Sequence, residues 1–236
     1  HALVVSYAVS RIMKIDHDIA TLVGVGSSIC GGSAIAAAAP VIKASDEAIA
    51  QSISVIFLFN VIAAFLFPTL GAILGFNDMG FGMWAGTAIN DTSSVVAAGQ
   101  TWASASGSDT ALNYATIVKL TRALAIIPIC LGLAYLTSKR KATTSEVKIS
   151  SIFPMFIIYF LGASIINTFA GSHFDFFQFL PAIGKFMIAM AMAAIGLNTN
   201  LVKLIKTGGK PILLGLICWF CIAVVSLAMQ HLLNIW

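Results

Sequence analysis

Charged side chains are scarce in this chain of 236 residues: Asp, Glu, Lys and Arg make up 9% of it, whereas hydrophobic residues make up 59%. A soluble globular domain is about 25% charged, and so few charges could not cover the surface of a soluble protein of this length. In a lipid bilayer the outer surface must instead be apolar. The composition therefore predicts a multi-pass helical membrane protein, and the absence of a basic stripe argues against nucleic acid as a partner.

Cysteine and histidine are also rare. The four cysteines are Cys30, Cys130, Cys218 and Cys221. All lie in apolar runs, so we expect free thiols in the membrane rather than a disulfide scaffold or a redox motif. The four histidines lie at segment ends or in loops and form no metal-ligand cluster. An intramembrane aspartyl protease needs two carboxylates, and only Asp91 lies deep in an apolar segment. We therefore expect neither an enzyme nor a cofactor.

Long apolar runs separated by helix breakers divide the chain into predicted membrane-spanning helices. We expect one transmembrane domain over residues 1–236, with a truncated helix at 1–13 and seven full spans. The spans are 19–43, 47–75, 81–104, 109–137, 151–170, 181–206 and 211–235. The first segment is too short to cross a bilayer and lacks the charged region and cleavage site of a signal peptide. We therefore expect further N-terminal helices before it.

Lysine and arginine are distributed unevenly between alternate loops. One set of loops and helix ends holds Arg11, Lys14, Lys139, Arg140, Lys141, Lys148, Lys203, Lys206 and Lys210. The opposite set holds Lys43 and Lys185. Because cytoplasmic loops are enriched in Lys and Arg, we expect the 138–150 and 203–210 connections in the cytoplasm and the 104–108 loop outside.

Three charged residues fit no loop. Asp91 lies near the middle of the 81–104 segment, and Lys119 and Arg122 lie near the middle of 109–137. Charge at bilayer depth is costly and usually faces a cavity or another charge. We expect either a functional site or a structural ion pair that joins two helices, with Asp91 within salt-bridge reach of Lys119 or Arg122.

Two predicted spans contain a polar, glycine-rich interruption: residues 24–33 within 19–43, and residues 86–94 within 81–104. Glycine disfavours continuous helix, so each segment is interpreted as a half-helix, a break and a second half-helix. Paired discontinuous helices near the bilayer centre are typical of transporter binding sites. The alternative is a pair of small-residue faces for close helix packing.

The two interruptions resemble each other at a constant offset, which predicts an internal duplication. Ile29, Ser33, Ala37 and Ala38 match Ile89, Ser93, Ala97 and Ala98, and Pro68 matches Pro128. Loop parity makes the two broken segments parallel. An inverted pair would require a different number of spans between them.

The candidate substrate-binding residues come from these breaks and from the helix that follows them. They are Ser28, Gly31, Gly32, Ser33, Asn90, Asp91, Thr92, Ser93, Ser94, Lys119 and Arg122. A helix that begins in mid-membrane presents unpaired N–H groups and partial positive charge. The hydroxyl residues at the breaks are expected N-caps, and such a helix end binds anions.

The charge balance of this site favours an anionic substrate, because Lys119 and Arg122 together outweigh Asp91. Asp91 is expected either to orient one of these cations or to take up a proton that couples transport to the proton gradient. Asn60, in the middle of the 47–75 segment, is a further candidate for ion coupling, and simple helix–helix hydrogen bonding would explain it equally well.

Five motifs, spread over essentially the whole chain, are together similar to the YeiH family of bacterial membrane proteins. They lie at residues 26–37, 84–99, 117–122, 194–201 and 209–216. The resemblance implies an inner-membrane location, further N-terminal helices and, from the label that family members carry, sulfate export. Asn90 departs from the pattern, since a histidine is common there, and this puts any mechanism that needs an imidazole in doubt. A weaker likeness relates residues 31–33 and 90–91 to the crossing, unwound helices of the bile-acid/sodium symporter superfamily.

The sequence therefore predicts an all-α bundle in the bacterial inner membrane, with two broken helices crossing near the bilayer midplane. The expected function is secondary transport of a sulfate-like oxyanion or a sulfonate by alternating access, coupled to H⁺ or Na⁺. A sodium-coupled carrier of organic anions is the alternative, with Asn90, Asp91 and unwound carbonyls holding sodium. Outside the class of transporters, the alternatives are a non-transporting membrane protein and an intramembrane enzyme. The expected partners are the bilayer and a small anion, and a homodimer is left open.

Overall fold

The computed structural model describes residues 2–140 and 209–236, and a few positions between 159 and 190. Within these parts every regular element is an α-helix, which confirms the all-α prediction. The helices are α1 (Ala2–Met13), α2 (His17–Ser28), α3 (Gly32–Ile42), α4 (Asp46–Ile73), α5 (Asp78–Ala88), α6 (Thr92–Ser106), α7 (Thr110–Ala123), α8 (Ile126–Arg140) and α13 (Gly209–Leu232). Apart from those few positions, the predicted spans 151–170 and 181–206 lie outside the described residues.

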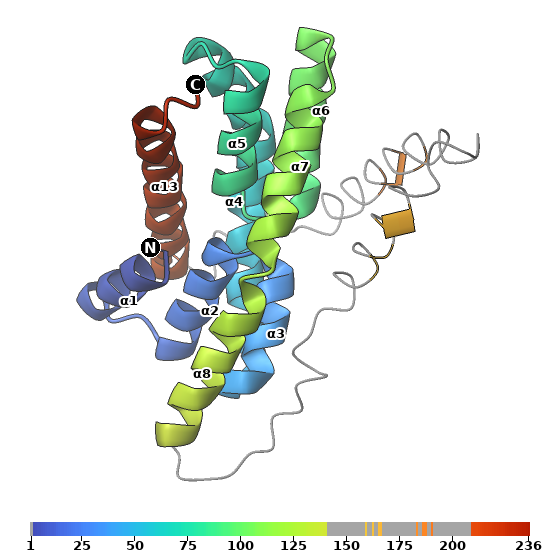
Figure 1. Cartoon of the computed structure of the whole chain (residues 1–236). Helices are drawn as coiled ribbons and strands as arrows, with labels where there is room; N and C mark the ends of the chain where they lie inside the picture. The colour runs from blue at the N-terminus through green and yellow to red at the C-terminus, as the bar shows by residue number, and fades with distance from the viewer. Residues whose placement is uncertain are drawn as a thin grey trace.

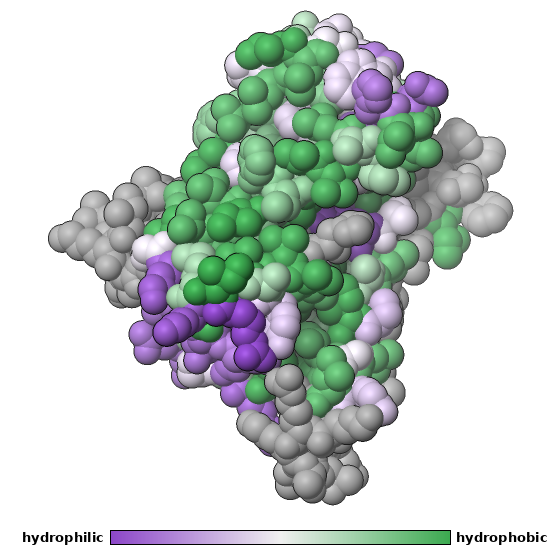
Figure 2. All heavy atoms as spheres, turned by 90° about the vertical axis from the view of Figure 1, so that its left-hand side faces the viewer, coloured by the Kyte–Doolittle hydropathy of each residue, from purple (hydrophilic) through white to green (hydrophobic). Residues whose placement is uncertain are grey.

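Within the described residues, three stretches are long and apolar enough to cross a membrane: Asp46–Ile73, Thr110–Leu133 and Gly209–Leu232. The first is α4, the second joins α7 to the start of α8, and the third is α13. They coincide with the predicted spans 47–75, 109–137 and 211–235. Figure 2 shows apolar side chains over much of one face, with hydrophilic residues gathered mainly in one patch at the lower left and a smaller one at the upper right. A surface embedded in a membrane is expected to be largely apolar.

The predicted span 19–43 does not continue through its break but folds back as a hairpin of α2 and α3. The chain turns at Gly31, whose φ of +72° suits a residue without a Cβ. A Cβ placed on Gly26 in α2 would lie 3.0 Å from Ile35 in α3, so the two helices lie against each other. The first residue of α2 and the last residue of α3 also line one pocket. Both ends of this hairpin are therefore on the same side of the bundle.

The predicted span 81–104 forms a second hairpin, of α5 and α6. Trp102, near the end of α6, donates from Nε1 to Oδ1 of Asp78, the first residue of α5, over 2.8 Å. Its ring also stacks on Phe81 with the ring centroids 4.2 Å apart. A helix that ran straight through the break would separate Asp78 and Trp102 by roughly 36 Å. The contact therefore excludes a continuous span.

The two hairpins enter the bundle from opposite ends of α4 (Figure 1). The open end of the α2–α3 hairpin adjoins the start of α4, and that of the α5–α6 hairpin adjoins its end. Because α4 has 28 residues, its two ends are about 42 Å apart. The tips of the hairpins consequently point toward each other, and they meet beside Asn60, near the middle of α4.

A hairpin followed by a long apolar stretch thus occurs twice, first as α2–α3–α4 and then, in the opposite direction, as α5–α6–α7–α8. The parallel relation predicted from loop parity is wrong, because each hairpin returns to its own side and removes one crossing from the count. The offset that aligns Ile29 with Ile89 places both residues at a hairpin tip. The duplication itself stays a prediction.

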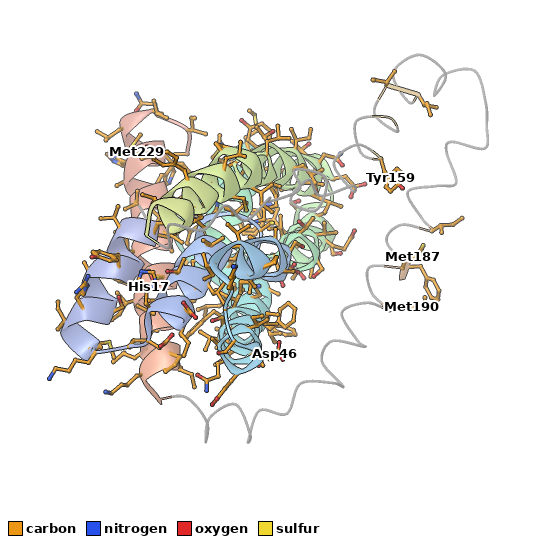
Figure 3. The ribbon with its side chains drawn as sticks, turned by 90° about the horizontal axis from the view of Figure 1, so that it is seen from below. His17, Asp46, Tyr159, Met187, Met190 and Met229 are labelled. Atoms are coloured by element: carbon orange, nitrogen blue, oxygen red, sulfur yellow. The ribbon has the colours of Figure 1, made fainter. Side chains whose placement is uncertain are left out.

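The hairpins also change which basic residues lie on the same side. Lys14 lies between α1 and α2, and Lys43 directly follows α3. Their neighbours Ile15 and Ile42 line one pocket, so both lysines lie at the end of the bundle where α4 starts. Figure 3 views the molecule from below and labels Asp46, the first residue of α4. Lys43 was predicted on the opposite side from Lys14, and that prediction is wrong. At the other end the described residues include no Lys or Arg. Because cytoplasmic ends of membrane helices are enriched in Lys and Arg, we expect the end with Lys14 to face the cytoplasm.

Small residues bring α7 close to the second hairpin. A Cβ on Gly86 in α5 would lie 2.7 Å from the carbonyl oxygen of Ala115 in α7, which leaves no room for any larger residue. Such close approach of backbones is typical of membrane helix packing. It brings Lys119, one turn after Ala115, to the tip of the α5–α6 hairpin.

Candidate functional site

Lys119 joins the two hairpin tips. Its Nζ donates to the carbonyl oxygen of Ile29, after the end of α2, over 2.8 Å, and to that of Ile89, after the end of α5, over 2.9 Å. The side chain is 0% exposed. One buried amine on α7 therefore binds both tips. The two residues that it contacts, Ile29 and Ile89, are also the residues that match each other in the two interruptions of the sequence.

Arg122, one turn further along α7, makes the same kind of contact. Its Nε donates to the carbonyl of Ser28 over 2.9 Å and its Nη2 to that of Ser27 over 2.6 Å. Its Nη1 donates to the carbonyl of Thr87. The last carbonyls of a helix lack intrahelical partners and carry partial negative charge. Lys119 and Arg122 thus bind the C-terminal ends of α2 and α5.

The expected ion pair between Asp91 and these cations is not formed. Asp91 is the N-cap of α6, and its Oδ2 accepts from the backbone N–H of Ser93 over 3.0 Å and of Ser94 over 3.3 Å. The Ser93 hydroxyl also donates to this carboxylate. The physical reason is local: a helix N-terminus has free N–H donors for a carboxylate, whereas the cations are occupied by carbonyls at helix C-termini.

The predicted N-caps lie one to three residues too late in the sequence. Gly31 and Asp91 are the N-caps of α3 and α6, rather than Ser33 and the hydroxyl residues that follow Asp91. Gly31 makes no side-chain capping bond, because it has no side chain. The N-terminus of α3 at the first hairpin tip therefore has no side-chain cap, whereas the N-terminus of α6 at the second tip is capped by the carboxylate of Asp91.

Two asparagines complete the contact between the tips. The backbone N–H of Asn90 donates to Oδ1 of Asn60 over 3.2 Å. A Cβ on Gly31 would lie 3.4 Å from Nδ2 of Asn60 and 3.6 Å from the carbonyl of Asn90. Nδ2 of Asn60 and both Nδ2 and Oδ1 of Asn90 are buried and have no partner among the described residues. An unpaired buried polar atom costs about 1–3 kcal/mol, so this cluster calls for a ligand or bound water.

The remaining candidate residues fall at or near these tips. Gly32 begins α3 beside the tip, and Thr92 begins α6. Ser94 is buried, Thr92 and Ser93 are half-buried, and Ser33 is exposed. In the described part of the chain, no three His, Cys, Asp or Glu side chains lie together in a way that could hold a metal ion.

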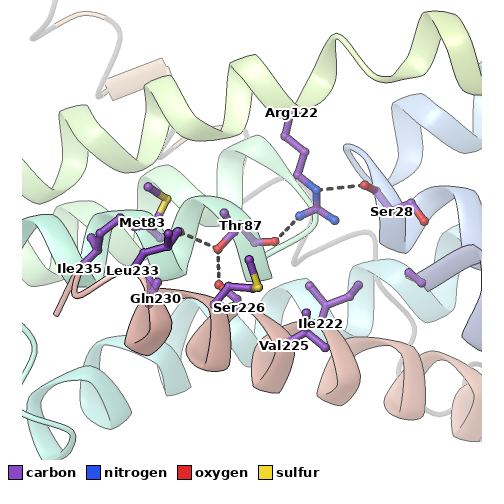
Figure 4. Close-up of a pocket in the computed structure, with 12 residues that line it drawn as sticks. Ser28, Met83, Thr87, Arg122, Ile222, Val225, Ser226, Gln230, Leu233 and Ile235 are labelled. Atoms are coloured by element: carbon purple, nitrogen blue, oxygen red, sulfur yellow. Dashed lines mark hydrogen bonds between the residues drawn. The ribbon is translucent and has the colours of Figure 1, made fainter.

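A pocket of about 330 Å³ lies between α5 and α13 and reaches the tip region (Figure 4). Its polar lining consists of Ser28, Thr87, Arg122, Ser226 and Gln230, and the rest is apolar. The hydroxyls of Thr87 and Ser226 share a hydrogen bond of 2.5 Å. Thr87 thereby connects two parts of the site: its hydroxyl contacts Ser226 on α13, and its backbone carbonyl accepts a hydrogen bond from the guanidinium of Arg122.

The family model described as conserved hypothetical protein 698 matches residues 1–215. This chain belongs to the UPF0324 family of membrane proteins. The resemblance to the YeiH family is confirmed, since that is the same family.

The UPF0324 relatives cover the chain from end to end. The UPF0324 membrane proteins of Streptococcus pyogenes serotype M3 and Streptococcus mutans are 56% and 57% identical to it, each over 100% of this chain and 71% of the relative. That of Fusobacterium nucleatum is 52% identical over 99% of this chain and 72% of the relative. No solved structure matches the chain. The names of these relatives describe membrane proteins and give neither a substrate nor a mechanism.

Sequence reasoning missed the α13 side of this UPF0324 site. Ser226 and Gln230 stand four residues apart in the largely apolar helix α13, so they share a face. Polar residues at that spacing in a spanning helix are a usable signal for a face turned toward the protein interior. The partners of Lys119 and Arg122 left no signal, because backbone carbonyls are present at every position.

Proposed function

We propose that this UPF0324 protein is a secondary transporter that carries a small oxyanion or a sulfonate across the bacterial inner membrane, with the substrate bound where the two hairpin tips meet. The observation that carries the proposal is the meeting of two hairpins from opposite sides around unpartnered buried amides and a buried amine. Non-helical backbone deep in a membrane occurs where it is buried in protein or lines a cavity. Discontinuous helices in such places form the binding sites of secondary transporters.

The donors at the tips favour an anion. The open N-terminus of α3 offers backbone N–H groups without a side-chain cap, and Asn60 and Asn90 each offer an Nδ2 without a partner. A helix N-terminus of this kind binds carboxylate, sulfate or phosphate groups. Lys119 acts as nearby positive charge that holds the tips in place, while the amide groups contact the substrate directly.

The two hairpins supply a route for alternating access. The α2–α3 hairpin opens toward the end with the lysines, and the α5–α6 hairpin opens toward the other end. Withdrawal of one tip from the other would expose the site to one side of the membrane only. Asp91 is the group that couples this motion to an ion, since its protonation would weaken the cap on α6. Sodium at Asp91 and Asn90 is the alternative form of coupling.

The proposal is tested by flux of radiolabelled sulfate and taurine into proteoliposomes that contain the protein, with pH and sodium varied independently. Asn90→Leu removes both unpartnered amide atoms, keeps the side-chain size and leaves the backbone bond to Asn60 intact. We expect it to reduce flux at least tenfold while the protein stays folded. Asn113→Leu is the matched control, because Asn113 is an exposed asparagine on α7.

The outcomes are distinct. If the wild type moves neither probe under any gradient, the transport function is wrong. If Asn90→Leu and Asn113→Leu both carry the anion at the wild-type rate, transport stands but its site is not at the tips. Flux that follows a sodium gradient and ignores pH would replace proton coupling by sodium coupling.

A further inference from the structure

We propose that the pocket between α5 and α13 is the chamber in which the substrate binds from the non-cytoplasmic side, and that it selects an organic anion with a short aliphatic body over an inorganic oxyanion. This inference rests on the proposed transport function and specifies its substrate. The pocket runs along α13 from Arg122 and Ser28 at the hairpin tips to Ile235 near the last residue of the chain described. Asn77, at the start of α5, donates to the carbonyl of Trp236, which fixes this end of the pocket at the side without lysine or arginine.

The inner end of the pocket suits an acidic group. A guanidinium carries five N–H donors in a planar fork, and Arg122 uses three of them for the carbonyls of Ser27, Ser28 and Thr87. The other two have no acceptor among the described residues. Arg122 also lines the pocket, so these donors are available to a carboxylate or sulfonate, whose oxygens match the fork.

The walls of the pocket suit an aliphatic body. Ile222, Val225 and Met229 on α13 line it together with Met83 on α5. A volume of about 330 Å³ falls at the lower end of the range for small-molecule sites. Sulfate has oxygen on every side and would leave most of them against hydrocarbon, which is unfavourable. An anion with an acidic group at one end and a few carbon atoms at the other satisfies both parts.

A third feature narrows the ligand further. Gln230 lines the pocket, is 3% exposed and donates from Nε2 to the carbonyl of Gly80, but its Oε1 has no partner in the described part of the chain. It lies one turn beyond Ser226, away from Arg122. A hydroxyl or amino group on the aliphatic body would donate to this oxygen. The pocket therefore fits a short sulfonate or carboxylate that carries a hydrogen-bond donor.

The test is equilibrium binding of linear alkanesulfonates, from methanesulfonate to hexanesulfonate, to the purified protein in detergent micelles. Each added CH₂ should tighten binding about two- to fourfold until the pocket is full. Val225→Trp fills the pocket and should abolish this dependence on chain length. Val224→Trp is the matched control, because Val224 is the neighbouring residue on α13 and does not line the pocket.

The Gln230 contact has its own comparison, between 2-hydroxyethanesulfonate and 1-propanesulfonate, which have the same number of heavy atoms. We expect the wild type to bind 2-hydroxyethanesulfonate more tightly than the lower hydrophobicity of this ligand alone would predict. Gln230→Leu should lose this extra affinity. Binding of all sulfonates with equal affinity, or equal effects of the two Trp variants, would overturn the inference; a lipid acyl chain in the pocket would give that result. Because binding is measured without flux, tight binding together with absent transport would instead refute the proposed function alone.

Discussion

Replacing Lys119 by methionine separates two roles that a buried cation can have. In the structure its Nζ is a donor to two backbone carbonyls and joins the hairpin tips. Methionine has nearly the same shape but no donor, so Lys119→Met would leave the carbonyl oxygens of Ile29 and Ile89 unpaired. If Lys119 holds the tips, the variant loses stability. If Lys119 were a ligand of the substrate only, the variant would lose transport at unchanged stability.

The expected size of the effect follows from the two bonds. Each buried carbonyl left unpaired costs about 1–3 kcal/mol, which gives roughly 2–6 kcal/mol for the pair. The loss is reduced because methionine does not carry the desolvation cost of a buried amine. We therefore expect Lys119→Met to lower the free energy of unfolding by about 3 kcal/mol.

The measurement is unfolding of the protein in mixed micelles by increasing sodium dodecyl sulfate, followed by circular dichroism. Lys210→Met is the control, because Lys210 is exposed at the start of α13, and a change within about 0.5 kcal/mol is expected for it. A free energy of unfolding for Lys119→Met that matches the control, together with abolished flux, would refute the tip-joining role.

Three further predictions test the hairpins and their caps. Gly31→Ala should destabilise the protein by about 1–2 kcal/mol in the same titration, since Gly31 has a φ of +72° that residues with a Cβ avoid; an unchanged midpoint would contradict the turn. Asp91→Ala should cost about 1 kcal/mol through loss of the α6 cap, and Asp91→Asn should recover most of it; equal losses would show that the charge, not the cap, matters. In the variants Lys14→Cys and Lys43→Cys, the new cysteine should react with a membrane-impermeant maleimide from one side of the membrane, and in Ser106→Cys from the other side. If Lys43→Cys reacts from the same side as Ser106→Cys, residues 19–43 form a continuous span and not a hairpin.

The positions of the two breaks were predictable, but the direction of the chain after them was not. Glycines before Gly31 and the polar run around Asn90 mark where helix is unfavourable. A break permits the chain either to continue or to reverse, and both leave the same local sequence. The reversal is decided by contacts such as that between Asp78 and Trp102, which lie 24 positions apart in the sequence. The side of Lys43 was predicted wrongly for the same reason. Residues 19–43 were taken as one crossing of the membrane, which puts the loop after them on the opposite side, whereas a hairpin returns to the side from which it started.

The depth of Lys119 and Arg122 was also predictable, whereas their partners were not. A lysine and an arginine in the middle of an apolar segment must be buried together with something polar. The sequence suggested Asp91 as that partner, because it is the one acidic residue at similar depth. The helix C-termini that bind them instead exist only once the chain has folded into hairpins.

By itself the sequence determined that this protein resides in a membrane, is built of helices, and interrupts two of them with polar, glycine-rich turns, because these properties follow from composition and from the local cost of glycine and charge. Only the tertiary structure decided that the interrupted helices are hairpins facing each other, that two cations bind their C-terminal carbonyls, and that a pocket along α13 leads to Arg122. Those features depend on which surfaces meet across long stretches of chain, and local sequence does not fix that choice.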